Sequence, residues 1–115
     1  MEASTVGTLY LLDYNGTLDR TGDPVAFLRA LKKHDPDSRV VVMSGNNIPR
    51  EVEAAADEFW SKPFSFNAIR DLNPASIVGG DDDAALLRAL THAARQYSIP
   101  MQVVTPGDLL FLIPE

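Results

Sequence analysis

The amino-acid sequence predicts an α/β protein: a three-layer, Rossmann-like domain in which helices cover both faces of a five-stranded parallel sheet. Short apolar runs rich in Leu, Val and Ile alternate along the chain with segments whose apolar residues recur at helical spacing. The apolar runs are hydrophobic on both faces, as in strands buried between two helix layers. Such alternation is typical of parallel strands joined by right-handed helical crossovers. At 115 residues and 45% hydrophobic, the chain suits one compact domain over residues 1–115.

The first predicted strand is "TLYLLD" at 8–13, which is rich in Leu and Tyr on both faces. After a polar loop, Asp23 provides an N-cap and Pro24 stands at the first helical position. The helix that they open has one face of Phe and Leu residues and ends near His34. The second buried strand, "RVVVM", is expected over 39–43.

Shorter elements follow in the middle of the chain. Pro49 can open a short helix that reaches about Asp57, and "EFWSK" at 58–62 is predicted as a short third strand. Ser65 can cap a helix that runs through Leu72. These elements continue the alternation of strand and helix.

The last third of the chain contains the clearest helix. "ASIVGG" at 75–80 is the fourth predicted strand, and "DDDAALLRALTHAARQY" at 81–97 has apolar residues at helical spacing with acids in its first turn. "MQVV" at 101–104 is the fifth strand, and 106–112 form a final short helix or turn. The sequence shows no internal repeat and no linker.

Composition excludes several classes of function. The net charge of −6, without a cluster of Lys or Arg, disfavours binding to nucleic acid or to an anionic membrane surface. The absence of cysteine excludes disulfides, thiolate metal sites and cysteine catalysis. Because no apolar stretch approaches the roughly 20 residues needed to span a bilayer, we expect a cytoplasmic protein.

Side chains suited to phosphoryl transfer follow four of the predicted strands. In an open parallel sheet, ligands bind beyond the carboxyl ends of the strands, where the strand order changes direction. The residues at these positions are a carboxylate, a hydroxyl, an ammonium and an acidic cluster. They are Asp13, Ser44, Lys62, Asp81, Asp82 and Asp83.

Each of these groups has a use in phosphoryl transfer, which depends on positioning and charge neutralisation. Asp13 could attack phosphorus in line and form an aspartyl phosphate. Together with Asp81 or Asp82, it could hold Mg²⁺, which takes oxygen ligands in octahedral geometry. Lys62 would place a positive charge beside the phosphate and beside Asp13. Donors to the phosphate oxygens would be Ser44 and the backbone amides around Asn15, Gly16 and Thr17.

The order and context of these residues resemble the haloacid dehalogenase (HAD) phosphohydrolase superfamily. The first motif of that family, Asp-x-Asp-Gly-Thr, corresponds to "DYNGT" at 13–17. Its second motif corresponds to "VVVMSG", its third to Lys62 and Pro63, and its fourth to "IVGGDDD" at 77–83. Together with the strand alternation, the resemblance implies the strand order 5-4-1-2-3 and Mg²⁺ as the cofactor.

The resemblance also implies a role for each residue that matches a motif. The catalytic positions are Asp13, Asn15 and Lys62; the phosphate-binding positions are Gly16, Thr17, Ser44, Gly45 and Lys62; the metal positions are Asp13, Asn15, Asp81 and Asp82. Asn15 departs from the motif, because the family has an aspartate there that acts as general acid and base. Loss of such a group typically removes a factor of about 10² to 10⁴ in rate.

A second departure concerns access to the site. The interval between Asp13 and Ser44 has room for a loop, one helix and one strand, but not for the cap domain that many relatives insert there. The resemblance therefore implies a capless form with an open site. Such a site suits a phosphorylated small molecule or macromolecule, with a protein partner or a second copy of the chain as a lid.

Two other hypotheses remain open. Read from its middle, the sequence resembles a circularly permuted response-regulator receiver domain, in which Asp13 would be a phosphoacceptor. Alternatively, the fold is catalytically decayed and serves as an interaction scaffold. The aromatic residues of "EFWSKPFSF" at 58–66 favour core and helix packing over a ligand platform, and they equally fit an exposed protein-binding face.

Overall fold

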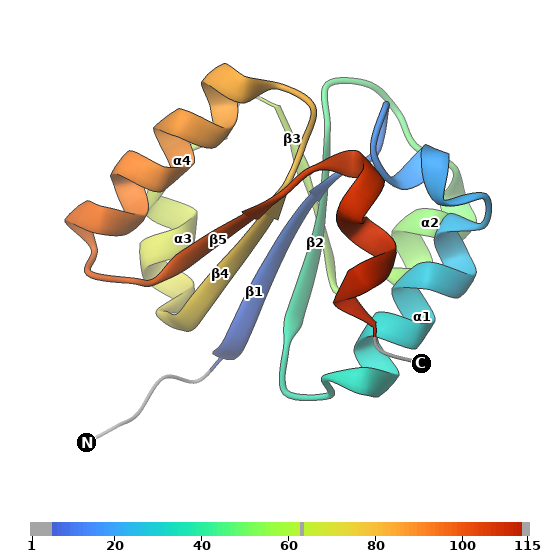
Figure 1. The fold of residues 1–115 in the computed structure, drawn as a ribbon, viewed down its shortest axis with the longest axis horizontal. Helices are drawn as coiled ribbons and strands as arrows, with labels where there is room; N and C mark the ends of the chain where they lie inside the picture. The colour runs from blue at the N-terminus through green and yellow to red at the C-terminus, as the bar shows by residue number, and fades with distance from the viewer. Residues whose placement is uncertain (1–5, 63, 114–115) are drawn as a thin grey trace.

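The computed structural model describes residues 6–62 and 64–113, and its sheet confirms the predicted α/β fold (Figure 1). Five parallel strands lie in the order β3-β2-β1-β4-β5, which is the predicted order 5-4-1-2-3 read from the opposite edge. The strands are β1 (Val6–Asp13), β2 (Arg39–Ser44), β3 (Glu58–Ser61), β4 (Pro74–Gly80) and β5 (Met101–Val104).

Helices cover both faces of this sheet, so the domain has the predicted three layers (Figure 1). The helices are α1 (Pro24–His34), α2 (Arg50–Ala55), α3 (Asn67–Leu72) and α4 (Ala84–Gln96), with 3-10 helices η1 (Leu18–Thr21) and η2 (Pro106–Leu112). Caps fix the two longest helices, because Asp23 accepts a hydrogen bond from the Ala26 amide at 3.1 Å and Asp83 accepts one from the Ala85 amide at 3.0 Å.

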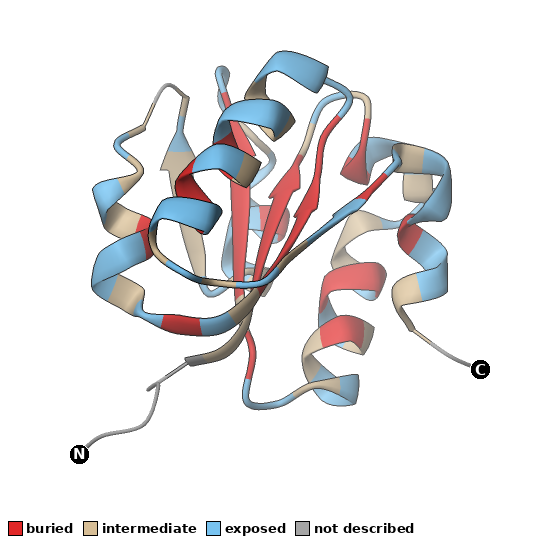
Figure 2. Cartoon of the chain, turned by 60° about the vertical axis from the view of Figure 1, so that its left-hand side comes forward, coloured by how far each residue is buried: buried red, intermediate tan, exposed pale blue. Residues whose placement is uncertain are grey.

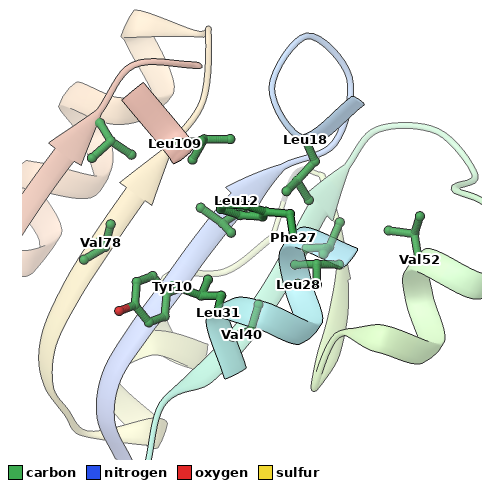
Figure 3. Close-up of a cluster of buried hydrophobic side chains, with 12 residues drawn as sticks. Tyr10, Leu12, Leu18, Phe27, Leu28, Leu31, Val40, Val52, Val78 and Leu109 are labelled. Carbon is green, nitrogen blue, oxygen red and sulfur yellow. The ribbon is translucent and has the colours of Figure 1, made fainter. Parts of the chain in front are cut away.

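The alternation of side chains along β1 divides the core into two clusters. Tyr10 and Leu12 point to one face of the sheet, where they pack with residues of α1, α2 and η2 (Figure 3). Leu9 and Leu11 point to the other face, where they pack with residues of α3 and α4. Successive residues of a strand face opposite sides of its sheet, so a strand buried on both faces must be apolar throughout. Figure 2 shows the result, with the central strands buried and the outer faces of the helices exposed.

The predicted elements are present, with small differences at their ends. The helix α2 ends at Ala55 instead of near Asp57, because the carboxylate of Asp57 accepts a hydrogen bond from the Val40 amide at 2.8 Å and ties the chain to β2. The helix α3 begins at Asn67, whose amide donates to the hydroxyl of Ser65 at 3.2 Å. Across residues 6–62 and 64–113, no helix has the length and apolar character needed to cross a membrane.

Candidate functional site

Strand register aligns the carboxyl ends of four strands. Asp13 at the end of β1 is paired in register with Met43, one residue before Ser44 at the end of β2. Lys62 directly follows β3, and Asp81 directly follows β4. The predicted residues therefore meet at one end of the sheet, as the topology requires.

A lysine bridges the two buried carboxylates at this end. Lys62 Nζ donates to Asp13 Oδ1 at 2.7 Å and to Asp81 Oδ2 at 2.8 Å. Its backbone amide also donates to the Ser44 carbonyl at 2.9 Å, which fixes the start of the side chain beside β2. The other oxygen of Asp81 accepts the Asp83 amide at 3.0 Å. Lys62 and Asp81 are therefore held in place by backbone hydrogen bonds as well as by the ion pairs.

A third carboxylate makes this end of the sheet strongly acidic. Asp13, Asp81 and Asp82, which we call the acidic trio, each offer an oxygen within 4.8 Å of the others. Asp13 and Asp81 are buried, with 4% and 2% of their surface exposed, whereas Asp82 is exposed. Three carboxylates face a single ammonium here, so negative charge remains uncompensated.

The electrostatic environment of the buried pair reflects this imbalance. Burial raises the pKa of Asp13 above its ordinary value, and the charge of Asp81 adds to the rise while Lys62 opposes it. Burial likewise raises the pKa of Asp81, against the opposing contact with Lys62. For Lys62, burial lowers the pKa, but hydrogen bonds to both carboxylates outweigh burial and raise it. The carboxylates are thus destabilised in their charged form, and a bound cation would relieve that cost.

The donor set fits a hard divalent cation. Mg²⁺ prefers oxygen ligands, is usually bound by one or two carboxylates, and keeps several of its waters. The acidic trio supplies oxygens only, and the exposure of Asp82 leaves that side of the cluster accessible to hydrated ions. These residues could therefore hold Mg²⁺, as the sequence predicts.

The loop after β1 packs its backbone against the acidic trio. Gly16 has a φ of +79°, and a Cβ atom placed there would lie 2.4 Å from Asp82 Oδ2. Only glycine meets both requirements without displacing a neighbour. The Gly16 amide donates to Asp19 Oδ1 at 2.9 Å and the Thr17 amide to the Tyr14 carbonyl at 3.3 Å, so these two of the predicted phosphate donors have partners within the loop.

Thr17 carries a polar atom that needs an explanation. The residue is fully buried, and among the described residues its Oγ1 is a buried side-chain atom without a hydrogen-bond partner. A buried hydroxyl without a partner costs free energy, so native structures usually satisfy it with a water or a ligand. Thr17 lies in the loop that the sequence predicts to bind phosphate.

Ser44, Asn15 and Gly45 lie on the β2 side of the site. Ser44 Oγ is buried and accepts the Asn46 amide at 3.0 Å. The exposed Asn15 side chain donates to the same oxygen at 3.4 Å. Gly45 is exposed, and a Cβ atom there would meet no heavy atom within 4 Å. The structure thus brings Asn15 to Ser44, and Pro63 lies outside the described residues.

Two features of the site were not anticipated from the sequence. The first is the role of Asp19, whose carboxylate closes the loop by binding the Gly16 amide; the spacing of three residues between an amide and an acid in a turn was the available signal. The second is a cavity of about 370 Å³ beside the acidic trio, lined by Lys62, Phe64, Phe66, Asp83 and Leu86.

Fold and site together define a Rossmann-like α/β domain with an acidic, lysine-bridged cluster at the carboxyl end of its parallel sheet. Comparisons with protein-family models, with curated proteins and with solved structures found no match. The functional argument therefore depends on the geometry of the site and on the motif resemblance.

Proposed function

We propose that this protein is a HAD-like, Mg²⁺-dependent phosphohydrolase or phosphotransferase that forms an aspartyl phosphate on Asp13. The observation that carries the proposal is the convergence of a buried carboxylate, a bridging lysine and two further acids at one end of the sheet. A phosphoryl group carries charge on three oxygens, so its transfer needs such a combination of nucleophile, cation ligands and fixed positive charge.

Each residue of the site has a separate role in the proposed reaction. The carboxylate of Asp13 attacks phosphorus, and the bond from phosphorus to the leaving oxygen breaks. Water then attacks the aspartyl phosphate, releasing inorganic phosphate and regenerating Asp13. Lys62 orients Asp13 through the contact at 2.7 Å and offers positive charge to the phosphate oxygens. Bound at the acidic trio, Mg²⁺ would neutralise part of the charge of carboxylates and phosphate.

Asn15 limits the rate of this reaction. An amide cannot donate a proton to the leaving group or accept one from the attacking water, and here it is hydrogen-bonded to Ser44 instead. We therefore expect slow turnover, with an open site that admits a phosphorylated small molecule or macromolecule, and with a protein partner or a second copy of the chain as the candidate lid.

The same residue favours a second candidate function. Without a general base beside it, an aspartyl phosphate is hydrolysed slowly and its lifetime is prolonged. A receiver-like phosphoacceptor domain needs this property, because its output depends on the phosphorylated state. The two functions share Asp13, Lys62 and the cation, and they differ in the fate of the phosphoryl group.

One set of assays separates these functions. Wild type, Asp13→Asn and Asn15→Asp are each incubated with Mg²⁺ and either an aryl phosphate or acetyl phosphate, and released phosphate and labelled protein are measured. If the protein is a hydrolase, the wild type should turn over slowly and Asn15→Asp should accelerate turnover tenfold or more. A phosphoacceptor predicts labelled wild type, with a shorter lifetime of the label in Asn15→Asp.

A matched control adds the same charge elsewhere. Asn73 is an exposed residue directly before β4, at the opposite end of the sheet from Asp13. Asn73→Asp should therefore leave both turnover and labelling unchanged. If no variant shows turnover or labelling while the fold is intact, the proposal is contradicted and the scaffold hypothesis is favoured.

A further inference from the structure

The cavity beside the acidic trio has the size and lining of a small-ligand site. Its volume is about 370 Å³, within the range of about 300 to 1,000 Å³ that is typical of ligand pockets. Two parts of the chain form it: the connection between β3 and α3, and the N-cap and first turn of α4. The cavity is therefore built from parts of the chain that the fold already holds together.

Aromatic side chains form one wall of this cavity. The rings of Phe64 and Phe66 meet edge to face with centroids 5.8 Å apart, and Trp60 packs on Phe64 at 5.1 Å. Trp60, Phe64 and Phe66 are half-buried against the cluster beneath α3 and α4, so their positions are fixed by the core. Leu86 also lines the cavity. A flat apolar group would find edge and face contacts here.

One side chain connects the cavity to the acidic trio. Lys62 lines the cavity, and its Nζ also donates to Asp13 and Asp81 at 2.7 and 2.8 Å. A group in the cavity therefore lies one side chain away from the proposed nucleophile. The exposed carboxylate of Asp83 also lines the cavity, where it disfavours a second negative charge on the ligand.

The chemistry of Asn15 also favours a substrate whose leaving group is aromatic. When the bond from phosphorus to the leaving oxygen breaks, the electron pair stays on that oxygen, which must then be protonated. An alkoxide needs a general acid for this step, and Asn15 cannot provide one. A phenolate, whose conjugate acid has a pKa of about 10, leaves as the anion and takes its proton from water.

We infer that the cavity binds the leaving group of the phosphoryl donor, and that this group is a neutral or cationic aryl ring: the substrate class is aryl phosphate monoesters. The inference rests on the proposed function and deepens it. It also supplies the selectivity that the missing cap domain would otherwise provide, because Phe64, Phe66 and Leu86 belong to the core domain itself.

Binding of non-hydrolysable phosphonates tests the inference without relying on turnover. Phenylphosphonate and methylphosphonate present the same phosphoryl group with and without a ring. Trp60, the single tryptophan of the chain, lies beside the cavity wall, so its fluorescence reports occupancy. In Mg²⁺, wild type should bind phenylphosphonate at least tenfold more tightly than methylphosphonate, because only the former buries apolar surface.

Two variants of the cavity wall and one control locate the ring. Phe66→Ala should reduce the preference for phenylphosphonate to about threefold or less. Phe66→Leu, which keeps more of the packing, should reduce it by a smaller factor if the alanine variant does not fold. Phe111→Ala removes a ring that is 81% exposed in η2, and it should leave the preference unchanged.

Asp83 allows a test of charge selectivity. Asp83→Asn keeps an N-cap residue for α4 while removing the carboxylate. It should improve binding of 4-carboxyphenylphosphonate relative to phenylphosphonate by about threefold, since a like charge is removed from the cavity.

The outcomes separate this inference from the proposed function. Equal affinity for phenylphosphonate and methylphosphonate, both dependent on Mg²⁺, would overturn the aryl site and leave the phosphoryl site standing. If phenylphosphonate binds equally well with and without Mg²⁺, and equally well to wild type and to Asp13→Asn, the cavity does not bind the leaving group of the phosphoryl donor. Failure of both phosphonates and of beryllofluoride to bind would overturn the proposed function, and the inference with it.

Discussion

Replacing Asp13 by asparagine tests the electrostatics of the site most directly, because it removes one buried charge and changes little else. We expect Asp13→Asn to stabilise the metal-free protein at pH 7. Lys62 keeps its contact with Asp81 at 2.8 Å in the variant, so no ammonium is left without a partner. The variant is therefore a test of charge and not of packing.

The expected magnitude follows from the distances. At an effective dielectric constant of about 20, the attraction between Lys62 and Asp13 at 2.7 Å is worth about 6 kcal/mol. Repulsion by Asp81, whose oxygen lies within 4.8 Å, is worth about 3.5 kcal/mol at the same dielectric constant, and the exposed Asp82 adds a smaller repulsion that solvent screens. Burial of the carboxylate adds a cost of several kcal/mol. Removing the charge should therefore yield a net gain, which we place at about 1–2 kcal/mol after relaxation.

The sign of the pH dependence agrees with this expectation. The pKa of Asp13 is raised in the folded state, first by burial, so its contribution to stability is complete below the ordinary value of about 4 and is lost as the pH rises through the folded-state value. The advantage of Asp13→Asn should thus be larger at pH 7 than at pH 4, and it should shrink as the pH falls through the folded-state pKa of Asp13 and the wild-type carboxyl becomes protonated.

Urea unfolding in EDTA at pH 7 and pH 4 measures the difference, and thermal unfolding should show a gain of about 4–8 °C at pH 7. Mg²⁺ with beryllofluoride should then raise the melting temperature of wild type but not of Asp13→Asn. Asp71→Asn is the control, since Asp71 is exposed and contacts Arg70 at 3.7 Å. A loss of more than about 1 kcal/mol in Asp13→Asn would refute the reasoning.

Three further predictions concern single residues. Lys62→Met should lower the free energy of unfolding by about 3 kcal/mol at pH 7, because two buried carboxylates lose their counter-charge. The loss should be smaller at pH 4, and equal losses in urea unfolding at the two pH values would contradict this. Alanine at Gly16 or at Gly22 is strained, because both glycines have a positive φ, but only the Cβ atom at Gly16 would clash with a carboxylate of the acidic trio. In thermal titrations with Mg²⁺, Gly16→Ala should therefore weaken the stabilisation by the cation, whereas Gly22→Ala should not. Burial, with the charge of Asp35, raises the pKa of Tyr10 to about 12, so absorbance titration should show a late transition that Tyr10→Phe abolishes. The contribution of Tyr10 to stability should be complete below about pH 10 and should be lost as the pH rises toward about 12.

The sequence was sufficient for the fold because each element carries its own local signal. A strand such as 8–13, apolar on both faces, can be buried only between two helix layers, and Asp23 followed by Pro24 marks the start of α1. The strand ends then determine which side chains meet, because parallel strands bring their carboxyl ends to one edge. The meeting of Asp13, Lys62 and Asp81 could therefore be predicted from topology.

The finer geometry of the site could not be predicted, because it depends on packing between distant segments. The sequence does not show that Lys62 contacts two carboxylates at once, or that Asp19 occupies the amide of Gly16. The cavity is the clearest case. The sequence shows that Phe66 and Leu86 are apolar, but the cavity that they line arises only from the way that the segments around α3 and α4 are placed on the sheet.

The position of Lys62 on the sheet has a consequence for the order in which the site forms and melts. Lys62 follows β3, a four-residue strand at the edge of the sheet whose ladder partner is β2. Edge segments with few ladder bonds open locally at a lower free energy than the centre of a domain. Opening of β3 would withdraw the ammonium from Asp13 and Asp81 while β1 and β4 stay folded. Amide hydrogens of β3 should therefore exchange faster than those of β1, and ligands that engage Lys62 should slow that exchange. Exchange at an edge strand would then report whether the site is occupied.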